Sequence, residues 1–482
     1  MKKAISIGIQ GFSALREQDC FFVDKTNFIK EWWENRDVVT LITRPRRFGK
    51  TLNMSMLECF FSNKYANRAD LFEGLSIWQE EAYRKLQGSY PVIFLSFAAV
   101  KAGNLEDAKT QIKQEIARLY RENRNLMKED IFGEDERELY YQTTVKMDDV
   151  TAQDSLRNLS EWMERYYGKK VIILLDEYDT PMQEAYVQGY WDEFTAFVRS
   201  LFNASFKTNP YLERAIMTGI TRVSKESIFS DLNNLQVITT TSDLYADCFG
   251  FTESEVFHVL DEFGMGDKKD EVKQWYDGFT FGEHKDIYNP WSITNYLDKR
   301  KTYPYWASTS SNGLVSRLIR TASADVKEKM EDLLNGREIV VSFDEQIVYN
   351  QLDHNENAIW SLLLASGYLK VKHVDYRGIT REPWYTLDIT NIETLSMFTT
   401  MFQDWFQNQD ANYGYFMKAL INGDLEAMNY YMNKVALATF SYFDVGSGNG
   451  SDPEPERFYH GFVLGLIAER AGIYEIRSNR ES

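Results

Sequence analysis

The most constraining feature of this sequence is a Gly-Lys-Thr tripeptide between a short apolar run and a helix-like segment. The apolar run covers residues 38–42, Gly49, Lys50 and Thr51 follow it, and the helical pattern begins near Leu52. A helix N-terminus offers unpaired N–H groups and a positive dipole end, a lysine adds a point charge, and a threonine hydroxyl ligates magnesium. The sequence therefore predicts a strand, a phosphate-binding loop and a helix in this order.

The loop departs from the usual Gly-x-x-x-x-Gly-Lys-[Ser/Thr] pattern at its first position, where Arg44 replaces glycine. The arginines of this loop form the densest basic cluster of the chain, and at this place a nucleotide is a more economical partner for them than nucleic acid. The residues that we expect to contact nucleotide are Arg44, Arg46, Arg47, Phe48, Gly49, Lys50, Thr51 and Leu52.

A second motif supports the first. Residues 171–175 form an uninterrupted apolar run that ends in Asp176 and Glu177, as a buried parallel strand delivering carboxylates to its C-terminal edge would read. This is a Walker B pattern, in which we expect Asp176 and Thr51 to hold magnesium and Glu177 to polarise the attacking water. A solvated loop lysine or a strand-ending cap would explain either motif alone, but the two together favour a magnesium–ATP site.

Composition narrows the class of protein. The chain has 482 residues, of which 44% are hydrophobic, so two or three domains are expected. A formal charge of −18 counts against broad binding to DNA or to an anionic membrane, while a local basic groove stays open. Three scattered cysteines, no long apolar stretch and no secretory leader pattern predict a cytoplasmic protein with no membrane partner.

Strand and helix patterns alternate through residues 1–240. After the first strand we expect strands at 91–97, 171–176 and 214–219, helices at 105–126, 155–167 and 191–202, and a loop at 130–138. The alternation predicts a parallel sheet with helices on both faces. The extra strand between the two motifs is typical of AAA-like ATPases. Residues 218–224 stand where a sensor would contact the γ-phosphate, which makes Thr218 and Arg222 candidates; an ordinary strand end with turn residues is the alternative.

Residues 241–375 predict a mainly helical, lid-like or winged-helix-like domain. The expected helices cover residues 252–262, 268–276, 292–299, 313–321 and 359–366. Two aromatic turns, Trp275-Tyr276-Asp277-Gly278-Phe279 and Tyr288-Asn289-Pro290-Trp291-Ser292, separate them. We expect these turns to cap and pin helices rather than to contact nucleotide directly.

Taken together, the motifs resemble those of the prokaryotic AAA-ATPase-like family with a C-terminal PD-(D/E)XK nuclease-like domain. The likeness spans nearly the whole chain, and the Arg-Pro-Arg-Arg-Phe-Gly-Lys-Thr loop is its most specific part, so Arg44 is the family's own variant. The resemblance implies P-loop roles for Lys50, Thr51, Asp176 and Glu177. The segments that carry it are Phe22-Val23-Asp24-Lys25-Thr26, residues 44–51, Leu175-Asp176-Glu177-Tyr178-Asp179, Thr218-Gly219-Ile220-Thr221-Arg222, Tyr276-Asp277-Gly278 and Tyr288-Asn289-Pro290-Trp291-Ser292.

Residues 376–482 resemble part of the nuclease-like domain, which implies a C-terminal α+β remnant; the likeness includes Glu393 after a strand-like segment, Glu456 and the segment from Tyr474 to Ser482. In the family this segment leads into Gly-x-Gly-Arg-x-Asp and Glu-x-Lys strands, which bind the metal. Because the sequence stops at Ser482, we expect no DNA cleavage by the residues present. Both a natural end and a truncation fit this pattern. His460 reads as a packing residue, and residues 445–456 as a loop.

Three functions follow from these patterns. The first is a magnesium-dependent ATPase that couples nucleotide state to a C-terminal effector, with Glu177 and Arg222 as catalytic residues. The second is a non-hydrolysing, nucleotide-gated switch or scaffold that exposes a protein-binding or self-association surface. The third is an ATP-regulated nuclease in a longer form of the chain.

Overall fold

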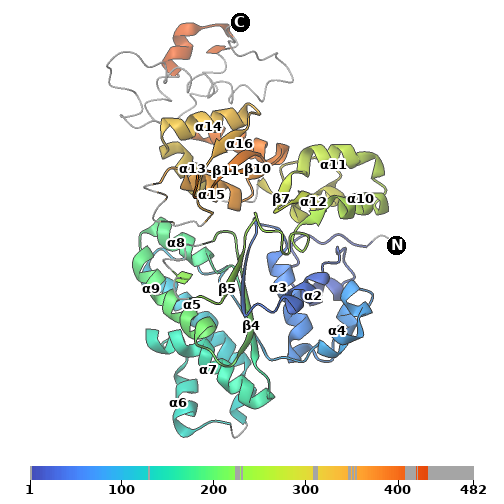
Figure 1. Ribbon diagram of the computed structural model, residues 1–482, viewed down its shortest axis with the longest axis vertical. Coiled ribbons are helices and arrows are strands. Elements are labelled where there is room, and N and C mark those ends of the chain that lie inside the picture. The colour runs from blue at the N-terminus through green and yellow to red at the C-terminus, as the bar shows by residue number, and fades with distance from the viewer. Residues whose placement is uncertain are drawn as a thin grey trace.

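The computed structural model describes residues 3–128, 131–222, 228–229, 232–307, 313–345, 349, 352, 355–407, 419–420 and 422–431. Figure 1 shows two parts, a lower one built around a single open sheet and an upper one that carries α10 to α16. We call residues 251–407 the C-terminal module. The lower part contains both predicted motifs, the phosphate loop and the Walker B strand. The C-terminal module lies beyond the upper ends of the strands of the lower sheet.

The lower sheet is entirely parallel, and its strand order is β2-β3-β4-β1-β5. The strands are β1 (Val39–Thr43), β2 (Val92–Ser96), β3 (Val171–Asp176), β4 (Leu212–Gly219) and β5 (Leu235–Ile238). This confirms the predicted parallel sheet and the predicted strands. It also places β4 between the strand before the phosphate loop and the strand that ends in Asp176, so the two motifs face each other across the end of β4.

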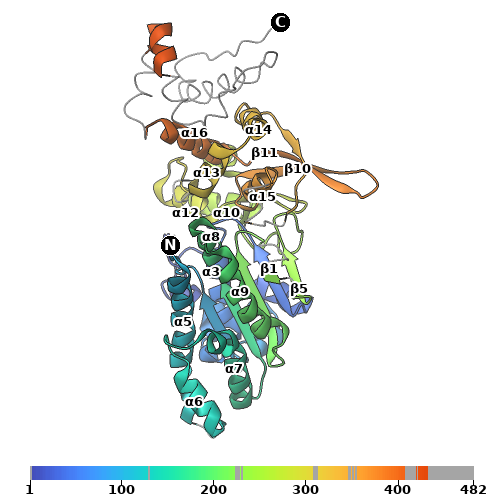
Figure 2. The same ribbon diagram turned by 90° about the vertical axis from the view of Figure 1, so that its left-hand side faces the viewer.

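Apolar residues on both sides of the strands explain why helices cover both faces of this sheet. Along β3, Ile172 and Leu174 belong to one core cluster, whereas Ile173 and Leu175 belong to the other. Successive side chains of a strand point to opposite faces, so a continuous apolar run needs cover on both. Helices α5, α7 and α9 supply it on one face, and α2 and α3 on the other (Figures 1 and 2).

The helix predicted at 191–202 has the observed bounds, whereas the one predicted at 155–167 begins at residue 149 and the one predicted at 105–126 ends at residue 122. The helices of this part are also more numerous than the sequence pattern predicted. They are α1 (Phe12–Glu17), α2 (Asn27–Asn35), α3 (Lys50–Phe61), α4 (Glu81–Leu86), α5 (Leu105–Glu122), α6 (Glu134–Gln142), α7 (Asp149–Tyr167), α8 (Thr180–Gln188) and α9 (Trp191–Phe202). The loop predicted over 130–138 is wrong from residue 134 onward. There Glu136 accepts a hydrogen bond from the Gly133 N–H, and acidic residues in the first turn are favoured by the helix dipole, so the charged segment starts α6.

The C-terminal module contains the predicted helices and two small antiparallel sheets. The first half comprises β6 (Phe251–Thr252), α10 (Glu253–Glu262), α11 (Lys269–Tyr276), β7 (Phe279–Phe281), β8 (His284–Tyr288) and α12 (Pro290–Lys299). The second half comprises α13 (Gly313–Thr321), α14 (Ala324–Leu334), β9 (Ile339–Val341), α15 (Ala358–Ala365), β10 (Leu369–Arg377), β11 (Glu382–Ile389) and α16 (Ile392–Gln407).

The sheets of the module have the orders β6-β8-β7 and β10-β11-β9. The β10–β11 hairpin extends away from the rest of the module (Figure 2). The sequence pattern predicted no strand at β6, β7, β8 or β9, because strands of two to five residues give little periodic signal. A boundary at residue 375 would cut β10 and separate it from β11, with which it pairs throughout.

Several predictions fall outside the described residues. Those on Glu456, His460, residues 445–456 and the segment from Tyr474 to Ser482 are among them. The three cysteines lie within the described part, where they are buried and unbridged, as expected for small apolar residues. No helix in the described ranges has both the length and the apolar character that crossing a membrane requires.

Candidate nucleotide site

The predicted phosphate loop, residues 44–51, connects the end of β1 to the start of α3. Gly49 is the N-cap of α3 and has φ +80°, a conformation that favours glycine, and no side chain caps this helix. Among the described contacts, the backbone N–H groups of residues 46–49 donate to no protein acceptor. An uncapped helix N-terminus preceded by free N–H groups fits an anion such as a phosphate.

Asp176 lies between two threonine hydroxyls. Thr51 Oγ1 donates to Asp176 Oδ2 at 2.7 Å, and Thr218 Oγ1 donates to Asp176 Oδ1 at 2.5 Å. The sheet order produces this arrangement, because β3 and β1 both flank β4 and all three strands end at the same edge. Burial raises the pKa of Asp176, and the two hydroxyl bonds oppose that shift. Clustered hydroxyl and carboxylate oxygens are the donor set that magnesium prefers.

Lys50 is buried beside this cluster. Its Nζ donates to the carbonyl oxygens of Arg44 and Pro45, each at 3.0 Å. Burial lowers the pKa of Lys50, while the negative charges of Glu177 and Asp176 favour its protonated form. The predicted lysine and carboxylates are therefore brought together at one end of the sheet.

Glu177 occupies an unusual backbone position immediately after β3. Its φ is +52°, in the left-handed region that residues other than glycine rarely adopt. Its Oε2 accepts a hydrogen bond from Thr180 Oγ1 at 2.9 Å, and its side chain is half-buried. Backbone strain of this kind persists only where the surroundings enforce it, and it is concentrated at functional sites.

Arg44 has contacts that favour a structural role, although its role as a nucleotide contact remains a prediction. Its side chain is fully buried, and Nη1 donates to the carbonyls of Thr43 at 2.9 Å and Thr239 at 2.7 Å. The guanidinium also lies 4.5 Å from the ring centroid of Phe281. Desolvation lowers the pKa of Arg44 to about 9. The arginine thus joins the end of β1 to the loop after β5 and to the C-terminal module.

The next loop residues also meet the C-terminal module. The Arg47 guanidinium lies 4.3 Å from the ring centroid of Trp291, and the Phe48 ring packs edge-on against Phe279 at 4.7 Å. Asn289 Nδ2 donates to the Arg46 carbonyl at 3.3 Å. The Asn289 side chain also accepts from the N–H groups of the first turn of α12, which confirms the predicted capping role of that motif.

Three other predicted residues occupy separate surroundings. The Arg46 side chain lines a small cavity with Thr221 and Trp306, between the sheet and the module. Leu52 is half-buried against the core cluster that includes α3. Arg222 lines a different cleft, whose other residues include Glu345 and Tyr385. Of the two sensor candidates, only Thr218 has a hydrogen bond to the Asp176 cluster.

The sequence pattern indicated no role for Asp179, which belongs to the motif Leu175-Asp176-Glu177-Tyr178-Asp179. Asp179 Oδ2 accepts hydrogen bonds from Ile220 N, Thr221 N and Thr221 Oγ1. Tyr178 donates its hydroxyl to the Thr221 carbonyl. A strand end followed by four polar or aromatic residues was the available signal, but only the strand order shows which turn they meet.

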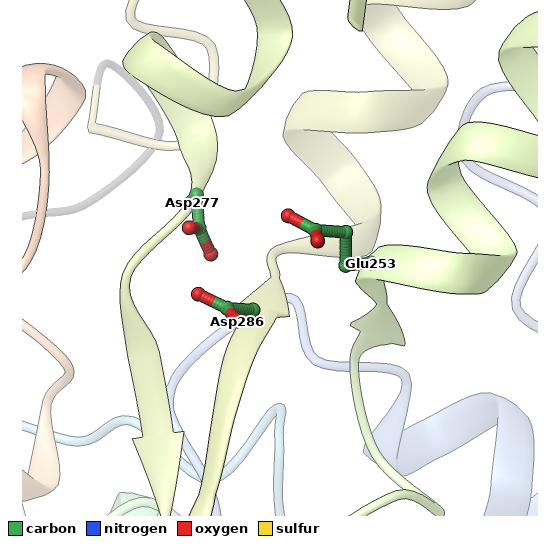
Figure 3. Close-up of side chains that lie close together, drawn as sticks. All are labelled: Glu253, Asp277 and Asp286. Atoms are coloured by element: carbon green, nitrogen blue, oxygen red, sulfur yellow. The ribbon is translucent and has the colours of Figure 1, made fainter. Parts of the chain in front are cut away.

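A group of three carboxylates lies in the C-terminal module, away from the phosphate loop. Glu253, Asp277 and Asp286 come from the start of α10, the end of α11 and β8, and Figure 3 shows their carboxylates converging. Desolvation and the neighbouring Asp286 raise the pKa of Asp277 to about 7. The Lys273 ammonium contacts Glu253 and lies 4.0 Å from Asp277 Oδ2. The lysine offsets part of the local negative charge.

Glu393, which the nuclease resemblance singled out, is fully buried near the start of α16. Its Oε2 accepts from Ser292 Oγ at 2.7 Å, and its Oε1 accepts from Trp306 N at 2.6 Å. Desolvation raises its pKa to about 7. These contacts connect α16 to the start of α12, the helix that also carries Trp291.

The fold fits a P-loop-like α/β protein, with the candidate nucleotide site at one end of its parallel sheet. The family described as "Predicted AAA-ATPase" matches residues 6–229. This match supports an AAA-ATPase-like assignment for that part of the chain and suggests a nucleotide-binding ATPase. A similar protein, described as an uncharacterized protein in the vnfD 5' region of Azotobacter chroococcum mcd 1, is 27% identical over 398 residues, covering 81% of this chain and 68% of that protein.

Proposed function

We propose that this protein is a magnesium-dependent ATPase whose nucleotide state is communicated to its C-terminal module. The observation that carries the proposal is the pair of hydrogen bonds from Thr51 and Thr218 to Asp176, next to the buried ammonium of Lys50. In a P-loop protein these groups hold metal, report the γ-phosphate and neutralise phosphate charge. Their convergence from the start of α3 and the ends of β3 and β4 supports the same roles here.

The proposed chemistry assigns one task to each group. The N–H groups at the start of α3 bind phosphate oxygens, and Lys50 exchanges its two loop carbonyls for phosphate oxygens. Thr51 and Asp176 would hold magnesium, which when bound neutralises charge on the phosphates. Glu177 orients and polarises the attacking water. Thr218 is the γ-phosphate contact that we favour, and Arg222 remains a candidate for stabilising the developing charge.

Two substitutions test this proposal. Lys50→Ala is expected to abolish ATP binding measured by calorimetry with magnesium present, because it removes the phosphate-binding charge at the helix start. Glu177→Gln is expected to retain binding and to lower steady-state phosphate release on the order of 100-fold or more. Unchanged ATP affinity in Lys50→Ala would refute the site. Equal phosphate release by wild type and Glu177→Gln would refute the hydrolytic step.

The coupling part of the proposal rests on contacts between the phosphate loop and the segment from β7 to the start of α12. Phe48 meets Phe279, Arg47 meets Trp291, and Asn289 binds the Arg46 carbonyl. Gly367 of the module also lies against the phosphate loop, so closely that a Cβ at this position would lie only 2.8 Å from Pro45 Cγ. A change of loop conformation on nucleotide binding therefore acts directly on the module, and α12 passes it to α16 through Ser292 and Glu393.

The same contacts support a second candidate, a nucleotide-gated switch that does not hydrolyse ATP. Binding alone would alter the loop and hence the module, with no chemical step required. Its exposed partner surface would then depend on ATP or ADP occupancy rather than on turnover. Tight ATP binding with phosphate release no faster in wild type than in Glu177→Gln would favour this switch over the ATPase.

A further inference from the structure

The proposed γ-phosphate contact, Thr218, lies near the end of β4, and the turn that follows it is held by the segment after β3. Tyr178 N donates to the Thr218 carbonyl at 2.9 Å, and the Tyr178 hydroxyl donates to the Thr221 carbonyl at 2.7 Å. These bonds bracket the turn at both ends. The two segments approach so closely that a Cβ on Gly219 would lie 2.7 Å from the Tyr178 ring.

Asp179 makes three further hydrogen bonds between the segment after β3 and the turn after β4. Its Oδ2 accepts from Ile220 N at 2.9 Å, Thr221 N at 2.7 Å and Thr221 Oγ1 at 2.8 Å. Asp179 is also the N-cap of α8, yet its side chain does not cap that helix. The carboxylate, which is 4% exposed, is thus committed to the neighbouring turn rather than to its own element. Bonds from N–H groups to a buried carboxylate are among the stronger hydrogen bonds in proteins.

We propose that Asp179 is a positioning residue for ATP hydrolysis, which holds the turn of residues 219–221 so that the Thr218 hydroxyl stays on Asp176. This inference rests on the proposed function, because Thr218 and Asp176 are the groups that it positions. Tyr349 supports the turn from the module side, since its hydroxyl lies 3.0 Å from Thr221 Oγ1. The turn therefore lies between the Walker B segment and the C-terminal module.

Backbone amide exchange in the full chain tests the geometric step without nucleotide. In Asp179→Ala, the Ile220 and Thr221 amides lose their acceptor and are expected to exchange about tenfold faster or more. Asp179→Asn retains a side-chain oxygen and is expected to restore most of the protection. Asp192→Ala, a substitution at an exposed aspartate of α9, is the matched control and is expected to leave both amides unchanged. Unchanged exchange in Asp179→Ala overturns the inference.

Turnover tests the catalytic consequence. Asp179→Ala is expected to lower kcat on the order of 10- to 100-fold, as small misplacements of catalytic groups do, with ATP affinity within about threefold of wild type. A variant with faster amide exchange but unchanged kcat overturns the inference and leaves the proposed ATPase intact. A wild-type protein without turnover refutes the proposed function instead. If the wild type does not turn over, the readout is the magnesium dependence of ATP affinity, because Asp176 is the proposed magnesium ligand beside Thr218. Asp179→Ala is then expected to weaken this dependence, and an unchanged dependence overturns the inference.

Discussion

The hydroxyl of Thr51 donates a hydrogen bond of 2.7 Å to Asp176, although the two residues are 125 positions apart in the chain. The bond links the first residues of α3 to the end of β3 across the edge of β4. It gives the predicted magnesium ligands a defined mutual geometry. The most direct predictions therefore concern the oxygen atoms of this pair.

Replacing Thr51 by alanine is expected to remove the effect of magnesium on ATP affinity, whereas Thr51→Ser is expected to keep it. Serine retains the hydroxyl that bonds to Asp176, and alanine does not. The measurement is calorimetric titration of ATP with magnesium and with a chelator. An Ala variant that still binds ATP more tightly with magnesium would contradict the assignment of Thr51 as a ligand.

Trp291→Ala is expected to tighten ATP binding by about threefold to tenfold, within the usual range of coupling free energies. The Trp291 ring stacks on Arg47 and helps to hold a loop in which Lys50 binds carbonyl oxygens. Weakening that loop conformation favours the one that binds phosphate. Trp275→Ala, a tryptophan of the same module that packs beside Tyr276, is the control. Affinity that is unchanged or weaker in Trp291→Ala would argue against coupling by this route.

Arg44→Lys is expected to lower the free energy of unfolding by about 2 kcal/mol, because lysine lacks the planar guanidinium that bonds to the buried carbonyls of Thr43 and Thr239 and lies against the Phe281 ring. Chemical denaturation measures this loss. ATP affinity measured well below the transition is expected to change little. A stable Arg44→Lys variant that binds ATP much more weakly would instead establish Arg44 as a direct nucleotide contact.

We expect the ionisation of Glu393 to lower the free energy of unfolding as pH rises from about 4.5 to 7. Its pKa in the folded protein is raised from 4.5 to about 7, so the folded state retains a proton that the unfolded state releases, and stability falls as pH rises through this window. The loss amounts to about 3 kcal/mol at most, from 1.36 kcal/mol per unit. Glu393→Gln removes the titration, and its unfolding free energy is expected to decline less over the same window.

Denaturation of both proteins at pH 5, 6 and 7.5 provides the comparison. The difference between them is the relevant quantity, because Asp277 also titrates with a pKa raised to about 7. Parallel pH profiles for wild type and Glu393→Gln would show that ionisation of Glu393 has no bearing on stability.

The sequence by itself determined the local elements of the nucleotide site. The apolar run ending in Asp176 predicted β3, and the Gly-Lys-Thr tripeptide predicted the loop and the start of α3, because each pattern reflects a local period or backbone requirement. The extra strand between the motifs also indicated an AAA-like arrangement, and the order of the five strands agrees with it.

Only the tertiary structure decided which distant groups meet. Asp179 bonds to the turn after β4, Arg44 is enclosed by carbonyls of the loop after β5, and Trp291 stacks on Arg47, and none of these partners is close in sequence. The spacing of apolar residues along a helix or strand tells which of its faces is apolar. Hydrogen bonds and ring contacts between distant residues depend on how these elements pack. The physical reason is that such contacts form across strand ends and module boundaries, whose relative placement no local pattern encodes.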